Sequence, residues 1–197
     1  TPDEPSNPVE GNLFERGSFS AEDTAYVDGG TNIWDFWTAY AADGSASLSG
    51  DTAYNDGCMT VSIANEGSAN YGIQLKYAPK LTLENGANYT LSFDATSSVA
   101  RGIVSQFQDS NYNTVGWNMS NLAAGETKQI TVNFQYNGET SSDYNFCINM
   151  GKMDGADAIG TAHTITFDNF QDEYNPPDDL KYKVYLQFDF VDSDIDS

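Results

Sequence analysis

The sequence predicts an all-β fold: a β-sandwich or jelly roll of two antiparallel sheets, with little or no helix. Many segments, each roughly six to eight residues long, alternate apolar and polar side chains with period two and are bounded by Gly, Asn, Asp or Ser. No window shows a sustained apolar stripe with the 3.6-residue period of a helix. Short strands at fairly regular spacing are typical of a sandwich.

The individual strands follow from turn residues and alternation. The segment 58–63 follows the turn residues 55–57, and 89–95 follows the turn 84–86. The segment 71–77 alternates and stops shortly before a proline. Further alternating segments are 102–107, 129–136, 144–150 and 164–170.

Alternation also predicts which side chains face the core. In 89–95 we expect the inward set to be Tyr89, Leu91, Phe93 and Ala95. For 71–77 two choices stay open: the outward set is either the apolar one or Gly72, Gln74 and Lys76. The polar set would suit the floor of a groove.

Composition excludes several classes of function. The 197 residues suit one domain with flanking segments. With 8 Lys+Arg against 29 Asp+Glu, the net charge is −21, which argues against nucleic acid and anionic membrane surfaces as partners. No apolar stretch approaches about 18 residues, so membrane insertion is not expected. His163 is the single histidine, which excludes a His-rich metal site and makes a Ser-His-Asp triad improbable.

The amino-acid composition divides the chain into four parts. We expect a Pro/Asp/Asn/Ser-rich linker at 1–11, the β-sandwich at 12–174, a second linker at 175–180, and an extra strand with an acidic tail at 181–197. The extra strand either pairs with the edge of this domain or begins a following module. With no signal peptide recognised, a module of a longer secreted or cell-surface protein fits best.

Two cysteines, Cys58 and Cys147, lie far apart in apolar, strand-like runs. They form either a single disulfide of an extracellular domain or two buried thiols, and the sequence leaves both alternatives open.

Several motifs, taken in order, resemble carbohydrate-binding modules of families 4, 9 and 22. They are Gly17-Ser18-Phe19, the aromatic cluster 34–40, the run 83–95 leading to Arg101, and the closing segment 164–170 with Asp168-Asn169-Phe170. The similarity covers about residues 12–174. It implies a jelly roll, no catalysis, a plant polysaccharide bound in a concave groove on one sheet, and a structural calcium ion away from that groove.

The resemblance also indicates groove residues. Sugar recognition needs aromatic faces for the C–H side of pyranose rings, and amide or charged groups for the hydroxyls. The matching positions are Tyr40, Arg101, Tyr112, Asn149, Gln74 and Lys76, with Gln106 and Gln108 between Arg101 and Tyr112. The alternative for each tyrosine is a place in the core, and for Arg101 a surface ion pair.

Tryptophans add two candidate platforms. We expect Trp37 to match the buried tryptophan of the family, which leaves Trp34 as a sugar platform. Trp117 lies in the polar run 113–118, where exposing an indole is costly without a function.

Strand parity limits how these groups combine. Arg101 and the pair Gln106 and Gln108 have opposite parity, so all three line one face only if a bulge lies between Ile103 and Gln106. Otherwise Arg101 faces the groove and the glutamines face the opposite surface.

The resemblance places calcium ligands at Ser18, Gly57 and Asp168. Three ligands are a partial set for a cation that takes six to eight oxygens. The alternative is that Asp168 only caps a turn.

The sequence therefore predicts a non-catalytic, extracellular module that attaches a secreted or cell-surface protein to plant glucan or xylan. Its partners are a polysaccharide or oligosaccharide and other modules of the same polypeptide. A starch (α-glucan) module of a bacterial surface starch-adherence system is the first alternative, and a structural or protein-interaction module is the second. A jelly-roll glycosidase is disfavoured, because no pair of carboxylates falls on adjacent outward strand positions.

Overall fold

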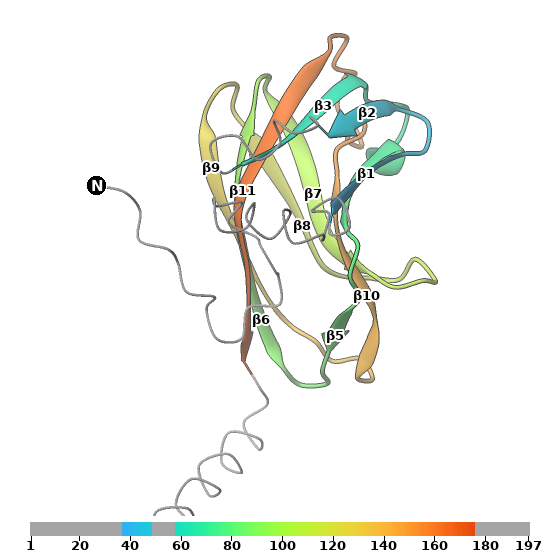
Figure 1. The fold of residues 1–197 in the computed structure, drawn as a ribbon, viewed down its shortest axis with the longest axis vertical. Helices are drawn as coiled ribbons and strands as arrows, with labels where there is room; N and C mark the ends of the chain where they lie inside the picture. Colours follow the sequence, from blue (N-terminus) through green and yellow to red (C-terminus); the bar gives the residue numbers. More distant parts are fainter. Residues whose placement is uncertain (1–36, 49–57, 176–197) are drawn as a thin grey trace, which may run out of the picture.

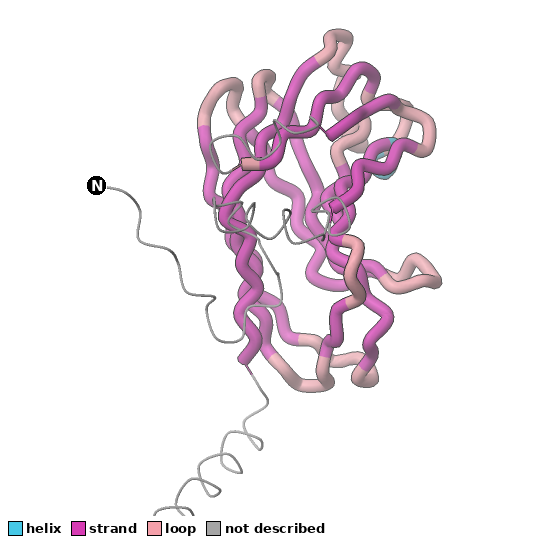
Figure 2. The backbone as a smooth tube through the Cα atoms, in the orientation of Figure 1, coloured by secondary structure: helices cyan, strands magenta, loops and turns pink. Residues whose placement is uncertain are grey.

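A computed structural model describes residues 37–48 and 58–175 (Figure 1). Strands account for nearly all of the regular secondary structure in this part, as Figure 2 shows, and confirm the predicted all-β class. The elements are β1 (Trp37–Ala41), β2 (Ser45–Leu48), β3 (Met59–Asn65), the 3-10 turn η3 (Asn70–Gly72), β4 (Ile73–Tyr77), β5 (Leu81–Leu83), β6 (Asn88–Ser97), β7 (Arg101–Gln108), β8 (Thr114–Leu122), β9 (Thr127–Gln135), β10 (Ser141–Asn149) and β11 (His163–Asn175).

The strands form two antiparallel sheets. The first has the order β1-β4-β10-β7-β8, with β5 paired to β10, and the second has the order β2-β3-β11-β6-β9. Because consecutive strands repeatedly change sheets, contacts between residues distant in sequence hold the two layers together.

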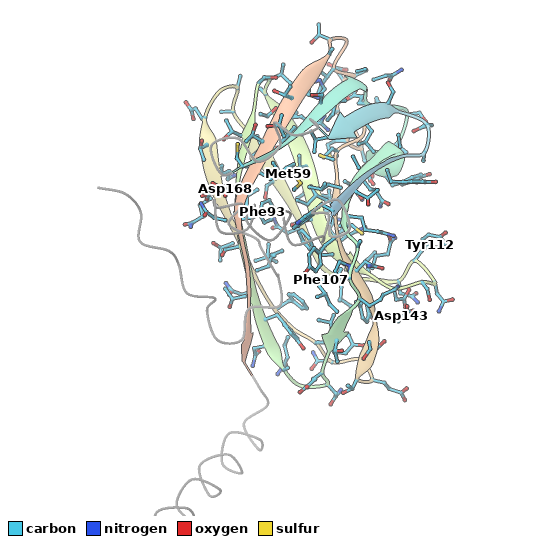
Figure 3. All side chains as sticks on the ribbon, viewed as in Figure 1. Met59, Phe93, Phe107, Tyr112, Asp143 and Asp168 are labelled. Atoms are coloured by element: carbon cyan, nitrogen blue, oxygen red, sulfur yellow. The ribbon has the colours of Figure 1, made fainter. Side chains whose placement is uncertain are left out.

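The core lies between the sheets and follows the predicted alternation. The expected inward set of β6 is buried: Tyr89, Leu91, Phe93 and Ala95. In β4 the buried residues are Ile73, Leu75 and Tyr77, which leaves Gln74 and Lys76 on the outward face. Trp37 is buried as expected, and its ring centroid lies 5.1 Å from that of Tyr77. Figure 3 shows Phe93 and Phe107 in this interior, whereas Tyr112 projects from the surface.

The predicted linkers and the extra strand at 181–197 lie outside the described residues, apart from Asn175, which ends β11. In the described part, no helix is long and apolar enough to cross a bilayer.

The structure favours thiols over a disulfide. Both Cys58 and Cys147 carry thiols: Cys58 directly precedes β3 of the second sheet, and Cys147 lies in β10 of the first. By alternation, the Cys147 side chain points away from the core side chains of Phe146 and Ile148. The disulfide alternative is therefore not supported.

We expect two thiols to titrate with Ellman's reagent in denaturant and Cys147 to stay unreactive in the native protein. Cys147 is fully buried, and burial raises the pKa of its thiol to about 11, so the reactive thiolate is scarce at neutral pH. A count of zero thiols in denaturant would restore the disulfide.

Candidate functional site

A groove of about 560 Å³ lies on the outward face of the first sheet. Seven residues singled out from the sequence line it: Tyr40, Gln74, Gln106, Gln108, Tyr112, Trp117 and Asn149. The other lining residues are Ala42, Asn70, Tyr71 and Thr114. The lining residues that lie in strands come from β1, β4, β10, β7 and β8, so the groove crosses all five strands of the main sheet order, whereas Ala42, Asn70, Tyr71 and Tyr112 lie in the adjoining loops and in η3.

Strand register explains why these residues share one face. Tyr40 pairs with Gln74, and Gln74 pairs with Asn149, so their side chains form a row across β1, β4 and β10. One row away, Lys76 pairs with Cys147 and Cys147 pairs with Gln106. Lys76 shares the outward face but is not among the residues that line the groove.

Side-chain amides form the floor, and some of them are held in a chain of hydrogen bonds. Gln74 Nε2 donates to Asn149 Oδ1 at 2.8 Å, and Asn149 Nδ2 donates to Asn70 Oδ1 at 3.2 Å. Asn70 Nδ2 in turn donates to Asp154 Oδ2 at 3.3 Å. This chain orients the three amides before any ligand arrives.

Two further floor amides have no hydrogen-bond partner among the described residues. The side chains of Gln106 and Gln108 make no hydrogen bond with any described residue, and Gln106 is only 5% exposed. Neither amide is among the buried polar atoms that lack a partner, so both reach the groove, where the hydroxyl groups of a ligand would meet donors and acceptors.

Aromatic rings form the walls. Tyr40, Tyr71, Tyr112 and Trp117 are 58–81% exposed, and all four line the groove. The only other large hydrophobic side chain exposed in the described residues is Met119. Exposed apolar surface gathered at one place marks a binding site more strongly than scattered single residues do.

Tyr71 is a groove residue that sequence reasoning missed. In the alternating segment 71–77 it counts as part of the apolar set, but the structure places it in η3, ahead of β4. A signal is Gly72, where an added Cβ would lie 2.4 Å from Asp43 Oδ1 and 3.0 Å from the Glu66 carbonyl oxygen, so a side chain in this close turn would force its neighbours to shift.

A bulge orients Trp117, and it lies in β8, not between Ile103 and Gln106 of β7, where one would be needed to bring Arg101 to the face of the two glutamines. Ser105 pairs with Asn118, whereas Phe107 pairs with Val115, so β8 holds one extra residue there. Gly116 has φ +63°, a left-handed conformation suited to glycine. The bulge lets Thr114 and Trp117 both line the groove despite their odd spacing.

The structure places Arg101 away from the groove, contrary to expectation. Strand β7 pairs with β10 without interruption over 104–108, so Gln106 and Gln108 face the groove and Arg101 has the opposite parity. Arg101 is buried, with Nη1 2.6 Å from His163 Nε2 and Nη2 donating to the Met150 and Gly151 carbonyl oxygens. Burial lowers the pKa of its guanidinium to about 10, opposed by nearby Glu66.

The predicted metal residues are only partly described. Ser18 and Gly57, like the candidate platform Trp34, lie outside the described residues. Asp168 is half-buried, and burial, followed by repulsion from Asp94, raises the pKa of its carboxyl to about 6. Among the described residues no three His, Cys, Asp or Glu side chains gather as a metal site. A partly buried carboxylate beside a second one fits a cation ligand, since a cation would offset both effects.

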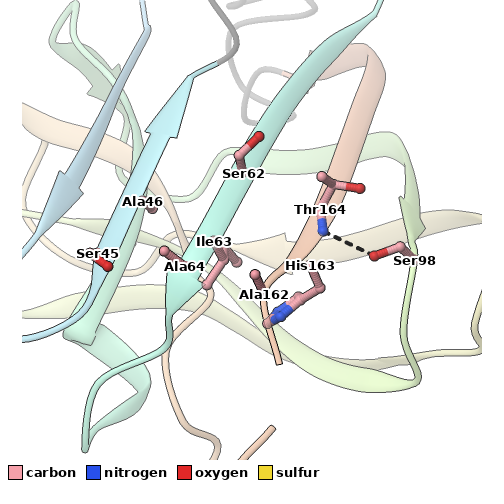
Figure 4. A pocket seen from close by; sticks show the side chains of 9 residues that line it. All are labelled: Ser45, Ala46, Ser62, Ile63, Ala64, Ser98, Ala162, His163 and Thr164. Carbon is pink, nitrogen blue, oxygen red and sulfur yellow. Dashed lines mark hydrogen bonds between the residues drawn. The ribbon is translucent and has the colours of Figure 1, made fainter. Parts of the chain in front are cut away.

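A second hollow, of about 580 Å³, lies on the second sheet (Figure 4). Its lining consists of Ser45, Ala46, Ser62, Ile63, Ala64, Ser98, Ala162, His163 and Thr164. Both ring nitrogens of His163 already have partners, Arg101 and the Thr161 carbonyl, and the lining contains no aromatic platform. This hollow therefore offers fewer groups that could recognise a ligand than the groove does.

Comparisons with known proteins also indicate a carbohydrate-binding fold. A family model described as a carbohydrate binding domain (CBM_4_9) matches residues 11–157. A solved structure titled "CBM4 structure and function" is 21% identical with a TM-score of 0.59, and the match covers 74% of this chain and 90% of that one. The N-terminal cellulose-binding domain of Cellulomonas fimi β-1,4-glucanase C is 18% identical with a TM-score of 0.54, covering 87% and 99% of the two chains.

An arabinose-bound α-L-arabinofuranosidase is 14% identical with a TM-score of 0.54, and the match covers 83% of this chain and 26% of that enzyme. No curated protein matches the chain. At these identities the structural matches show a shared fold.

Proposed function

The chain belongs to the carbohydrate-binding domain family CBM_4_9, and from this premise we propose that it is a non-catalytic module whose groove holds a neutral β-glucan or xylan chain. The observation that carries the proposal is the groove itself, in which four exposed aromatic rings accompany a floor of side-chain amides. Aromatic rings contact the apolar faces of pyranose rings, and amides both donate to and accept from hydroxyl groups.

Charge supports a neutral ligand. The lining residues that the structure describes include no Lys, Arg, Asp or Glu, and the chain carries a net charge of −21. An acidic polysaccharide would be repelled by the protein as a whole and would find no cation among the lining residues.

The size of the groove supports a short stretch of polysaccharide chain. Five strands at a spacing of about 4.8 Å span roughly 19 Å, enough for about four pyranose rings.

The lining also supports a binding role without catalysis. Hydrolysis of a glycosidic bond generally uses two carboxylates about 5–9.5 Å apart across the cleft. The described lining residues offer side-chain amides and hydroxyl groups and no such pair of carboxylates.

We place the module outside the cell, where it attaches a longer secreted or surface protein to its polysaccharide. The arabinofuranosidase supports this arrangement, because the matched region makes up only 26% of that chain.

Affinity electrophoresis in native gels containing barley β-glucan, xylan or soluble starch tests the function. We expect retention by β-glucan or xylan, compared with a gel that contains no polysaccharide. Retention by starch alone would make the module an α-glucan binder, and migration unchanged in all three gels would overturn the proposal.

We also propose a structural calcium ion that uses Asp168 together with Ser18 and Gly57. The half-buried Asp168 carboxylate beside Asp94 supports it.

Chelation with EDTA should lower the melting temperature without abolishing polysaccharide retention. An ion that binds only the folded protein stabilises it by mass action, so its removal lowers the melting temperature. Polysaccharide retention should persist because Asp168 is not among the groove residues. Differential scanning calorimetry with and without EDTA, followed by calcium add-back, measures the effect. An unchanged melting temperature together with no metal in elemental analysis would exclude the ion.

A further inference from the structure

We propose that Asp143, which lies outside the groove lining, is a positioning residue that holds Tyr112 against the polysaccharide. This inference rests on the proposed function of the groove. It starts from Tyr112, which is 81% exposed and lies in the loop 109–113 between β7 and β8. Figure 3 shows Tyr112 projecting at the side of the molecule, with Asp143 close to the base of its loop.

The backbone of Tyr112 needs support from its surroundings. Its φ is +67°, a left-handed conformation that bulky residues rarely adopt. Such a conformation persists only where neighbouring contacts hold it, and it is often found at ligand-binding sites.

Asp109 supplies the first set of contacts, within the loop itself. Asp109 Oδ1 accepts hydrogen bonds from the backbone N–H groups of Asn111 at 2.9 Å and Asn113 at 2.8 Å. The Tyr112 N–H donates to the Asp109 carbonyl oxygen at 3.0 Å. These bonds set the shape of the loop but do not tie it to the rest of the sheet.

Asp143 supplies that tie. Its Oδ2 accepts hydrogen bonds from the backbone N–H of Ser110, at 3.1 Å, and from the Ser110 hydroxyl. Among the described residues, no other side chain outside the loop bonds to residues 109–113.

Asp143 is itself held in place. Lys80 Nζ donates to Asp143 Oδ1 at 2.9 Å and to the Asp143 carbonyl oxygen at 3.2 Å. The Ser110 hydroxyl and then Lys80 lower the pKa of this carboxyl to about 2, so it stays a charged acceptor. The loop is thus tied through Ser110 to a carboxylate on β10, the central strand of the first sheet.

A similar aspartate–serine contact lies beside Tyr71, the second of the groove's aromatic residues to be held in this way. Asp43 Oδ2 accepts from the backbone N–H of Ser68 at 3.0 Å and from its hydroxyl at 2.5 Å. Ser68 lies in the loop that leads into η3 and Tyr71. Two aromatic walls of one groove are therefore each secured by an aspartate that receives both donors of a serine.

A double-mutant cycle tests whether Asp143 acts through Tyr112. Asp143→Ala, Tyr112→Ala and the double variant are titrated calorimetrically with cellohexaose, xylohexaose or maltohexaose, matching the polysaccharide that retains the wild type. We expect Asp143→Ala to weaken binding roughly three- to tenfold in the wild type and less than twofold in the Tyr112→Ala background. Equal losses in both backgrounds would overturn the proposal.

Further variants separate positioning from charge and from folding. Asp143→Asn keeps an acceptor oxygen for Ser110 and should restore most of the affinity. Glu126→Ala removes the same charge from an exposed turn between β8 and β9 and should change nothing. Ser110→Ala, which leaves the backbone tie in place, replaces Asp143→Ala if that variant does not fold, with a smaller loss expected.

A readout without ligand keeps this test independent of the proposed function. Amide hydrogen exchange in residues 109–113 should be faster in Asp143→Ala than in the wild type and unchanged in Glu126→Ala. If no oligosaccharide binds the wild type, the proposed function fails, but hydrogen exchange still measures whether Asp143 holds the loop 109–113 in place. Unchanged exchange in Asp143→Ala would overturn the positioning role, whatever the ligand.

Discussion

Replacing Arg101 with alanine is expected to lower the free energy of unfolding by about 3–5 kcal/mol, because it breaks a buried network around a charged group. The change would leave the carbonyl oxygens of Met150 and Gly151 without their guanidinium donor. It would also remove the cation near the buried side chain of Glu66.

For a domain of this size, the loss corresponds to a fall in melting temperature of roughly 6–20 °C. Thermal unfolding followed by circular dichroism measures it. Lys128→Ala, which removes an exposed cation from β9, serves as the control and should shift stability by less than about 0.5 kcal/mol. An unchanged melting temperature together with lost polysaccharide affinity would instead return Arg101 to the binding site.

Removing an aromatic wall of the groove is expected to weaken polysaccharide binding while leaving stability nearly unchanged, the reverse of the Arg101 substitution. Tyr40→Ala and Tyr112→Ala should each weaken binding by about 2 kcal/mol or more, roughly thirtyfold, since truncating an aromatic anchor removes a large contact face. Their melting temperatures should hardly change, because Tyr40 is 58% and Tyr112 is 81% exposed.

Isothermal titration with the matching hexasaccharide measures the loss. Met119→Ala is the matched control, because Met119 is also exposed on β8 but does not line the groove. Full affinity in both tyrosine variants would place the binding site elsewhere on the molecule.

The strands and their inward faces could be predicted from sequence because alternation is a local property. The buried positions of β6 and β4 follow directly from the period-two pattern. The outward set of β4 stayed ambiguous, since Tyr71 extends the apolar series by one member. The structure ends that series at η3, the 3-10 turn that places Tyr71 ahead of β4.

The parts of the site that depend on pairing between strands were harder to predict. The bulge is set by the register of β8 against β7, and the run 113–118 does not reveal which strand carries the extra residue. The role of Arg101 depends on acceptors from the distant residues Met150, Gly151 and His163, which only the fold brings together.

The chain of amides on the groove floor gives the site a direction. Every hydrogen bond in it is donated the same way, from Gln74 through Asn149 and Asn70 to the carboxylate of Asp154. A polysaccharide strand is also directional, with reducing and non-reducing ends that present different sequences of hydroxyl groups. A floor polarised in one sense favours one orientation of that strand, so a catalytic partner joined to this module would face a consistent way along the polymer.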